Sequence, residues 1–193
     1  MITSNLNVFP HKGIYEVLLG TSGISDNVSP IGLRFFDDIR VRLYPGSMTL
    51  RNITLYPYCS IHISQDPTLF YLGLSGKLKG SSVSYGLPIV DAINCILIAK
   101  CSQISLGVPS EFSLIFIEEL GSCTERALSR GDGLFIDLLV HITRIDLLPE
   151  IEAKKLLDII KYEIGVINRT SPHLSEYVNE ISESLKSKGY KLD

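Results

Sequence analysis

The sequence predicts an α+β protein in which the strands come first and the helices follow. Over residues 1–121, short apolar stretches with period-two alternation are divided by turn-forming residues, which is typical of β-strands. Over residues 122–193, apolar side chains recur at helical spacing. Strands and helices that are segregated in this way favour an α+β fold. We therefore expect a strand-rich domain over 1–121 and a C-terminal helical subdomain over 122–193.

Composition excludes several classes of protein. The chain has 193 residues, 45% of them hydrophobic, and a formal net charge of −3. We therefore expect no nucleic-acid partner and no membrane partner. The polar start of the chain lacks the apolar region of a secretory signal, so we expect a cytoplasmic protein. Four cysteines form no C-x-x-C pair and are expected to be reduced thiols: Cys59, Cys95, Cys101 and Cys123.

The first strands are expected to form an antiparallel meander. Alternating apolar residues predict strands over 14–21, 29–36 and 39–44, and turn-forming residues separate them. Residues 1–12 are expected to be an unstructured start.

The stretch from Arg40 to Ile53 reads as a strand, a Pro-Gly turn and the first turn of a helix. Ser47 or Thr49 can cap this helix. A helix N-terminus presents free N–H groups, so two hydroxyls, Arg42 from the strand and Arg51 from the helix could together hold a phosphate. The alternative is an ordinary capped helix with solvated arginines, and residue types alone favour this alternative because caps are far commoner than anion sites.

The middle of the chain predicts three more strands and a short helix. Asp66-Pro67 marks the start of the helix, after a strand over 58–64. The glycine- and serine-rich stretch 75–86 is either a plain surface loop or a flap over a ligand. Two long strands follow, over 92–103 and 111–120. The first is apolar on both faces, so a helix or a second subunit must cover its outer face, and we expect the C-terminal helices to do so.

Three apolar stripes predict the C-terminal helices. They consist of Phe135, Leu138, Leu139, Ile142 and Ile145; then Leu156, Ile160, Ile164 and Ile167; then Leu174, Tyr177, Val178, Ile181 and Leu185.

No catalytic or metal-binding motif stands out. The sequence has no phosphate-binding glycine loop, and no histidine lies at metal-ligand spacing from another histidine or cysteine, so we expect no metal site. No catalytic residue is assigned. His141 either makes a packing hydrogen bond or, with Arg144, belongs to a site; the residue types favour the packing role.

Several stretches resemble DUF447, a mainly archaeal family of flavin-reductase-like proteins. The similar stretches are Ile14–Ser22, Ser29–Leu33, Arg42–Asn52, Ile61–Phe70, Arg126-Ala127 and Leu138–Arg144. The resemblance implies an antiparallel split β-barrel that binds FMN, followed by a C-terminal helical segment packed on it. It also implies a homodimer.

The resemblance further implies where FMN would bind. The ring side would be the backbone of Ser29, Pro30, Ile31 and Gly32. The phosphate side would be Arg42, Ser47, Thr49 and Asn52. Flavin chemistry needs no catalytic triad, because the isoalloxazine ring carries the electrons.

Two classes of function follow from this resemblance. The first is a flavin-dependent oxidoreductase or flavin reductase, which takes hydride from NAD(P)H or reduces a small-molecule substrate. The second is a flavin- or ligand-binding module without catalysis, or a dimeric interaction protein that has lost FMN.

Overall fold

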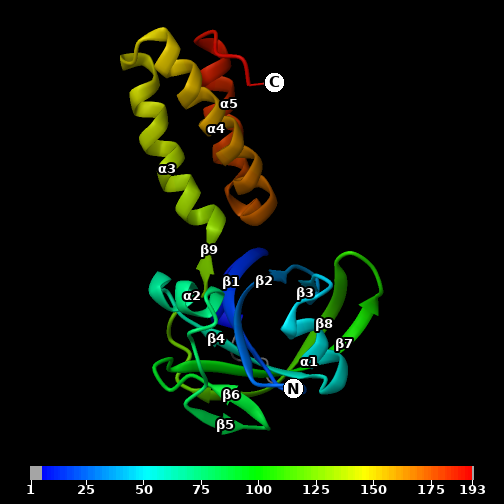
Figure 1. Ribbon diagram of the computed structural model, residues 1–193. Helices are drawn as coiled ribbons and strands as arrows, with labels where there is room; N and C mark the ends of the chain where they lie inside the picture. The colour runs from blue at the N-terminus through cyan, green and yellow to red at the C-terminus, as the bar shows by residue number, and fades with distance from the viewer. Residues whose placement is uncertain (1–5, 193) are drawn as a thin grey trace. The chain divides into compact units, whose positions relative to one another are not determined.

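The described chain, residues 6–192 of this computed structural model, divides into two compact units (Figure 1). The barrel unit holds the described chain up to Pro10, and then Tyr15–Leu128. The helical unit holds His11–Ile14 and the chain from Ser129 onward. Each unit has its own buried core.

Six strands close into a barrel. Their order around the ring is β2, β3, β8, β7, β4 and β1, and a further pairing of β1 with β2 closes it. The registered neighbours are antiparallel, which confirms the predicted antiparallel barrel. The strands are β1 (Gly13–Thr21), β2 (Asn27–Phe35), β3 (Ile39–Leu43), β4 (Tyr58–Ile63), β7 (Cys95–Ser105) and β8 (Ser110–Gly121); a short β9 (Leu128–Ser129) follows.

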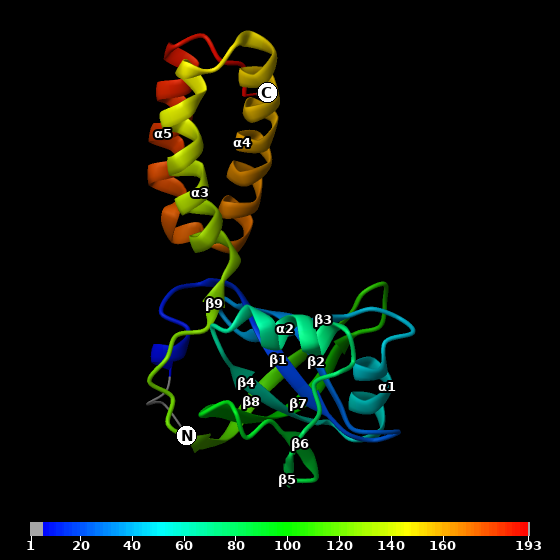
Figure 2. The same ribbon diagram turned by 60° about the vertical axis from the view of Figure 1, so that its left-hand side comes forward.

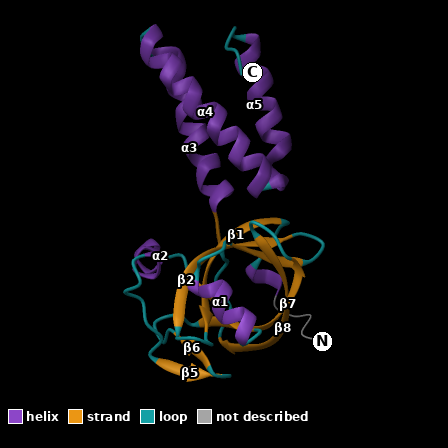
Figure 3. Cartoon of the chain, turned by 45° about the vertical axis from the view of Figure 1, so that its right-hand side comes forward, coloured by secondary structure: helices purple, strands orange, loops and turns teal. Residues whose placement is uncertain are grey.

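The inside of the barrel is filled by alternate residues of the strands, because successive side chains of a strand point to opposite faces. Val17 and Leu19 of β1 face inward, as do Leu33 of β2 and Val41 of β3, and all four are 0% exposed. Helix α1 (Met48–Leu55) lies across the opening of the ring and adds Ile53 to this core (Figure 3).

The segment before β1 also belongs to the core. Residues 1–5 of the predicted unstructured start lie outside the described residues, and Leu6–Val8 form a 3₁₀ turn. Val8 and Phe9 are each 1% exposed, so the prediction is wrong for them. The Phe9 ring lies 5.1 Å from Tyr15, 5.5 Å from Phe35 and 6.3 Å from Phe116, between centroids. An aromatic ring among three others gains packing and burial that a polar sequence context does not reveal.

The outer face of β7 is covered from within the barrel unit. Cys95 through Ala99 are all buried, as the apolar run predicts. Ile96 and Ile98 form a second cluster with residues of β6 (Leu87–Ile89) and α2 (Pro67–Leu74). The expectation that the C-terminal helices or a second subunit cover these residues is therefore wrong.

The stretch over 75–86 is partly a hairpin. Strands β5 (Ser82–Ser84) and β6 are antiparallel, and Tyr85 and Gly86 between them have φ of 55° and 66°. Leu87 and Ile89 are buried, which anchors the hairpin to the barrel wall. The stretch is thus neither the plain loop nor the free flap that the composition suggested.

His62 fastens the segment after β6 to the barrel. Its side chain is fully buried, with Nδ1 3.1 Å from the Leu18 carbonyl oxygen. The Val90 N–H donates to Nε2 at 3.2 Å. Burial lowers the pKa of His62 to about 4, against the opposing effect of its backbone hydrogen bonds. The imidazole is therefore neutral at pH 7, with one nitrogen as donor and the other as acceptor.

Two of the four cysteines form a disulfide, so the expectation of four reduced thiols is wrong for Cys95 and Cys123. The β7–β8 register pairs Cys95 with Gly121, and the chain then turns so that residue 123 comes beside residue 95. Cys59 and Cys101 are free and buried, with their Sγ atoms 3.4 Å apart. Hydrogen bonding to Cys101 and burial both raise the pKa of the Cys59 thiol.

Three helices make up most of the helical unit and lie side by side (Figures 1 and 2). They are α3 (Arg130–Arg144), α4 (Glu150–Thr170) and α5 (Ser175–Ser187), with short 3₁₀ turns at Ile145–Leu147 and Pro172–Leu174. The apolar stripes of the three helices pack against one another. The buried residues of this core are Leu138, Ile145, Ile160, Ile167, Val178 and Leu185. No described helix is long and apolar enough to cross a membrane. That the helical segment packs on the barrel stays a prediction.

The start of α3 packs closely against the residues at the end of α4. A side chain at Gly131 would lie 2.4 Å from Ser171 Oγ, so only glycine fits there without a shift. Beside it, Asp132 Oδ1 accepts hydrogen bonds from the hydroxyls of Ser129 at 3.0 Å and Ser171 at 2.7 Å. These contacts join the start of α3 to the turn between α4 and α5.

His141 has a packing role within this unit. Its Nδ1 lies 3.0 Å from the carboxylate of Glu163, which is 3% exposed. The pair joins α3 to α4, which supports the packing interpretation, with a partner on a neighbouring helix.

Stability should depend on the protonation of His62. Its pKa is 6.5 in the unfolded chain and about 4 in the folded one. As pH falls from 7, the unfolded chain therefore binds the proton first. His62 should thus lower the free energy of unfolding between pH 6.5 and 4, by about 3 kcal/mol at the lower end. Urea unfolding across this range should show a shallower pH dependence for His62→Gln, which cannot titrate; equal slopes in the two proteins would contradict the assignment.

Neighbouring leucines of α3 should respond differently to truncation. Leu138 is 0% exposed, whereas Leu139, predicted on the same buried stripe, is 37% exposed. Leu138→Ala should lower the free energy of unfolding by about 2–5 kcal/mol, and Ile160→Ala similarly, because each leaves a cavity. Leu139→Ala should cost clearly less, and denaturant titration of the three variants tests this order.

Candidate functional site

Ser47 begins α1, as one of the two predicted caps. Its Oγ accepts the Leu50 N–H at 3.3 Å and donates to the Tyr44 carbonyl oxygen at 2.9 Å. Gly46, with φ of 89°, supplies the left-handed residue that the turn before the helix needs. The capping prediction is therefore confirmed for Ser47.

Asn27 brings Ser29 and Thr49 together. Its Nδ2 donates to Ser29 Oγ at 2.9 Å and to Thr49 Oγ1 at 3.1 Å. The first bond stays within β2, and the second reaches α1. Thr49 is 2% exposed, so its hydroxyl faces the barrel rather than open solvent.

Asn52 shapes the turn between β1 and β2. The residue is fully buried, and its Nδ2 donates to the carbonyl oxygens of Thr21 at 3.2 Å and Ser25 at 2.7 Å. Its Oδ1 accepts the Ile24 N–H at 2.9 Å. Both ends of this carboxamide are thus engaged inside the chain, so Asn52 can support a ligand site by holding the turn.

The backbone over 29–32 lies beyond the registered pairing of β2 with β3. The β2–β3 ladder runs from the pair Phe35–Ile39 to the pair Leu33–Val41, so residues 29–32 lie beyond its last pair. All four are half-buried. Pro30 packs against α2, where a side chain added at Gly73 would meet the Pro30 ring at 3.1 Å. This part of β2 is therefore covered by α2 and bordered by an unpaired stretch toward β3.

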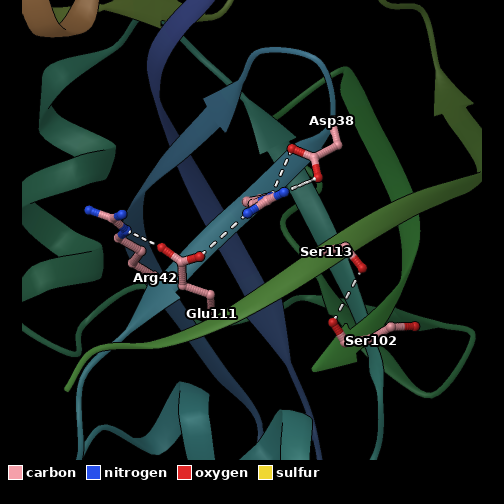
Figure 4. A network of polar contacts seen from close by, with 6 residues as sticks. Asp38, Arg42, Ser102, Glu111 and Ser113 are labelled. Atoms are coloured by element: carbon pink, nitrogen blue, oxygen red, sulfur yellow. Dashed lines mark hydrogen bonds and ion pairs between the residues drawn. The ribbon is translucent and has the colours of Figure 1, made fainter. Parts of the chain in front are cut away.

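Arg42 lies on the outer face of β3 and is paired (Figure 4). Its Nε donates to Glu111 Oε1 at 2.6 Å, across the β3–β8 pairing that places these residues opposite each other. The Arg42 hydrogen bond, together with the charges of nearby arginines, lowers the pKa of Glu111. Figure 4 shows the other nitrogens of Arg42 on the side away from Glu111, so they remain available to a ligand.

The predicted residues thus form two groups. Ser47, Thr49 and Asn52 lie at or in α1, and Asn27 joins Ser29 to them. Arg42 lies on the outer wall in a pocket of about 180 Å³, lined by Arg34, Phe36, Asp38, Arg40, Arg42 and Glu111.

Three residues of these groups were not predicted from the sequence. Asn27 could have been predicted, because it lies two residues before Ser29 and so shares one face of the same strand with it. Glu111 could not have been predicted, since it lies 69 residues from Arg42 in the chain. Arg34 was recognisable as a polar residue of its strand, but its neighbours depend on the register.

Two larger cavities of the barrel unit lie elsewhere. One of about 350 Å³ is lined by Cys95, Ser122 and Asp66, among others. The other, of about 620 Å³, is lined by Phe9, Phe35 and Arg126, among others. Neither contains a residue of the predicted site.

Comparison with known proteins agrees with this architecture. An FMN-bound DUF447 protein from Methanosarcina mazei has a TM-score of 0.55 and 20% identity, over 93% of this chain and 98% of that one. An NADH:FAD oxidoreductase from Streptomyces globisporus has a TM-score of 0.50 and 8% identity, over 62% of this chain and 82% of that one. At these identities the likeness is one of fold. Among curated proteins, no sequence matches.

The fold is therefore the split β-barrel of flavin-reductase-like proteins, followed by helices. Family models place the chain more narrowly. The N-terminal domain of a protein family of unknown function, DUF447, matches residues 15–119, and the C-terminal DUF447 model matches residues 129–183. The chain belongs to the DUF447 family.

Proposed function

We propose that the protein binds FMN and acts as a flavin-dependent oxidoreductase or flavin reductase. The second substrate would be NAD(P)H or a small molecule. Membership of DUF447 supports this proposal, since a solved member of the family is FMN-bound. The fold shared with an NADH:FAD oxidoreductase supports the reaction class.

One observation carries the proposal. Strand β2 continues beyond its last pair with β3, and the Asn27 side chain of the same strand joins it to α1. Successive residues of a strand direct their backbone N–H and C=O groups to opposite edges, so alternate residues of 29–32 face the side where the β3 ladder ends, and their backbone groups could meet the polar edge of an isoalloxazine ring. Pro30 has no N–H and could offer only its carbonyl oxygen. This backbone could therefore border the ring.

The phosphate would lie at the start of α1. A helix N-terminus favours an anion through its free N–H groups and its dipole. Ser47 is placed at this end, and Arg42 keeps nitrogens free for a charge-assisted contact. Thr49 would support the site from its bond to Asn27. Asn52 would act indirectly, by holding the turn beside it.

FMN, when bound, would supply the hydride- and electron-accepting chemistry of its ring. The chain would then bind the phosphate, orient the ring against β2 and leave one ring face for the second substrate. This division of labour needs no catalytic triad.

The alternative function is a binding or dimeric interaction protein that has lost FMN. This alternative is favoured because two of the predicted FMN-binding residues already have partners in the chain. Asn52 and one edge of Arg42 are hydrogen-bonded to other residues of the protein. The colour of the purified protein separates the alternatives, since bound flavin is yellow.

We further propose a cytoplasmic homodimer. Exposed apolar side chains at and near the β7–β8 hairpin support the dimer: Ile104, Leu106, Val108 and Ile115 are 46%, 87%, 80% and 62% exposed. Disulfides such as Cys95–Cys123 are rare in a reducing cytoplasm, but they are common in the intracellular proteins of hyperthermophilic archaea.

Arg42 should distinguish FMN from riboflavin. Loss of a charge-assisted contact in Arg42→Ala should weaken FMN binding by about 10- to 150-fold. Riboflavin, which lacks the phosphate, should bind both proteins alike. Thr49→Ala should weaken FMN binding less, because Thr49 supports the site only through its neutral hydrogen bond with Asn27. Flavin fluorescence during titration of apoprotein measures all of these affinities.

Arg169→Ala is the control, because it removes an exposed arginine that belongs to neither group of the candidate site, and it should leave FMN affinity unchanged. Equal losses for FMN and riboflavin in Arg42→Ala would place the phosphate elsewhere. Wild-type protein that binds no FMN would exclude the flavoprotein assignment.

The dimer should be visible in solution. Light scattering at micromolar concentration should give twice the chain mass of 21.4 kDa. Replacing two exposed apolar side chains in Leu106→Ser/Ile115→Ser should shift the mass toward the monomer, because a stable interface needs about 1,000 Å² of well-packed surface. A wild-type monomer at these concentrations would contradict the proposal.

A further inference from the structure

The outer wall of β2 and β3 gathers three arginines around two carboxylates. The β2–β3 register places Arg34 directly opposite Arg40, and Arg42 follows two residues later on the same face of β3. Asp38 and Glu111 are the acids of the pocket that these arginines line. Like charges placed directly opposite each other on a sheet are destabilising, so this arrangement needs compensation.

The two carboxylates compensate only two of the arginines. Arg40 Nε lies 2.8 and 2.7 Å from the two oxygens of Asp38, and Arg42 Nε lies 2.6 Å from Glu111. The second oxygen of Glu111 is 3.6 Å from Arg40 Nη1, so this acid is shared. The pocket therefore keeps one positive charge in excess.

That excess lies at Arg34. Among the described residues no carboxylate forms an ion pair with it; its guanidinium carbon instead lies 5.4 Å from the centroid of the Phe36 ring. Burial and the positive charge of Arg42 both lower the pKa of Arg34, with Arg40 adding to them and Glu111 opposing. Arg34 is thus a partly desolvated cation with donors to spare.

The volume of the pocket limits the size of the group that could bind to these donors. Its volume is about 180 Å³, below the 300–1,000 Å³ that is typical of pockets for whole organic ligands. A guanidinium fork matches the oxygens of a phosphate, and a phosphate monoester carries close to two negative charges at pH 7. The pocket suits one such group, with the remainder of its ligand outside.

We propose that the pocket at Arg34 binds a phosphate monoester on the second substrate and so selects a phosphorylated nicotinamide donor over an unphosphorylated one. The donor's identity rests on the proposed function, whereas the anion site rests on the pocket itself. Arg34 supplies the uncompensated charge, Arg40 adds to the positive field, and the Phe36 ring borders the site. Arg42 directs its free nitrogens away from Glu111 (Figure 4), which leaves them for the flavin phosphate.

Calorimetric titration of the full-length protein with NADP⁺ and NAD⁺ tests the proposal without turnover. Wild type should bind NADP⁺ at least about 10-fold more tightly, which is what one charge-assisted phosphate contact contributes. Arg34→Gln should reduce this ratio to within about threefold while leaving the affinity for NAD⁺ unchanged. Inorganic phosphate should compete with NADP⁺ in wild type and much less in the variant.

Two variants serve as controls. Arg169→Gln removes the same charge from an exposed position of the helical unit and should leave the ratio unchanged. Glu111→Gln removes a competing carboxylate from the pocket and should raise the NADP⁺ affinity, opposite in sign to Arg34→Gln. A fall in NADP⁺ affinity in Glu111→Gln would contradict the charge argument.

Other outcomes overturn the inference. These are equal affinities for NADP⁺ and NAD⁺ in wild type, or equal losses for both ligands in Arg34→Gln. Competition by inorganic phosphate without a preference for NADP⁺ would reject the donor assignment. FMN titrations separate this inference from the proposed function: Arg34→Gln should change FMN affinity by less than about threefold, and a larger loss would assign Arg34 to the flavin phosphate instead.

Discussion

The structure of the barrel unit depends on filling the inside of a closed ring of six strands. Closure removes the exposed sheet edges that an open sheet would present, but it requires every inward side chain to pack without gaps. Strand β1 shows the constraint most clearly, because Val17 and Leu19 fill the inside while Leu18 packs outside with the second cluster. Phe9 and Ile53 complete the filling from segments that are not part of the ring. Helix α1 thereby acquires a fixed position, and the start of that helix is where the candidate flavin site begins.

Local signals in the sequence predicted the elements near the site. The Pro-Gly turn followed by Ser47 gave the start of α1, and Asp66-Pro67 gave the start of α2, because caps and turns depend on neighbouring residues alone. The alternation of apolar and polar residues along the strands predicted which side chains face the inside of the barrel. The run in β7 also showed correctly that both of its faces are buried.

Long-range pairings could not be predicted in the same way. The apolar run of β7 correctly predicted that Ile98 is covered, but the predicted cover was wrong, since nothing in the composition shows that the hairpin of β5 and β6 folds back onto the barrel wall. The disulfide of Cys95 and the partner of Arg42 follow from the registers of β8 with β7 and β3. Period-two patterns specify the face of each residue but not its cross-strand neighbour. For that reason Arg42 was predicted in one group with Ser47, Thr49 and Asn52, whereas the structure pairs it with Glu111 on the outer wall.

The disulfide makes the stability of the two units depend differently on their surroundings. It closes a loop over a sequence separation of 28 that contains the whole β7–β8 hairpin. In the chain-entropy account a loop of this length stabilises the fold by about 3–4 kcal/mol, by restricting the unfolded chain. All four cysteines precede residue 124, so the helical unit receives no such contribution. A reductant would therefore weaken the barrel unit selectively.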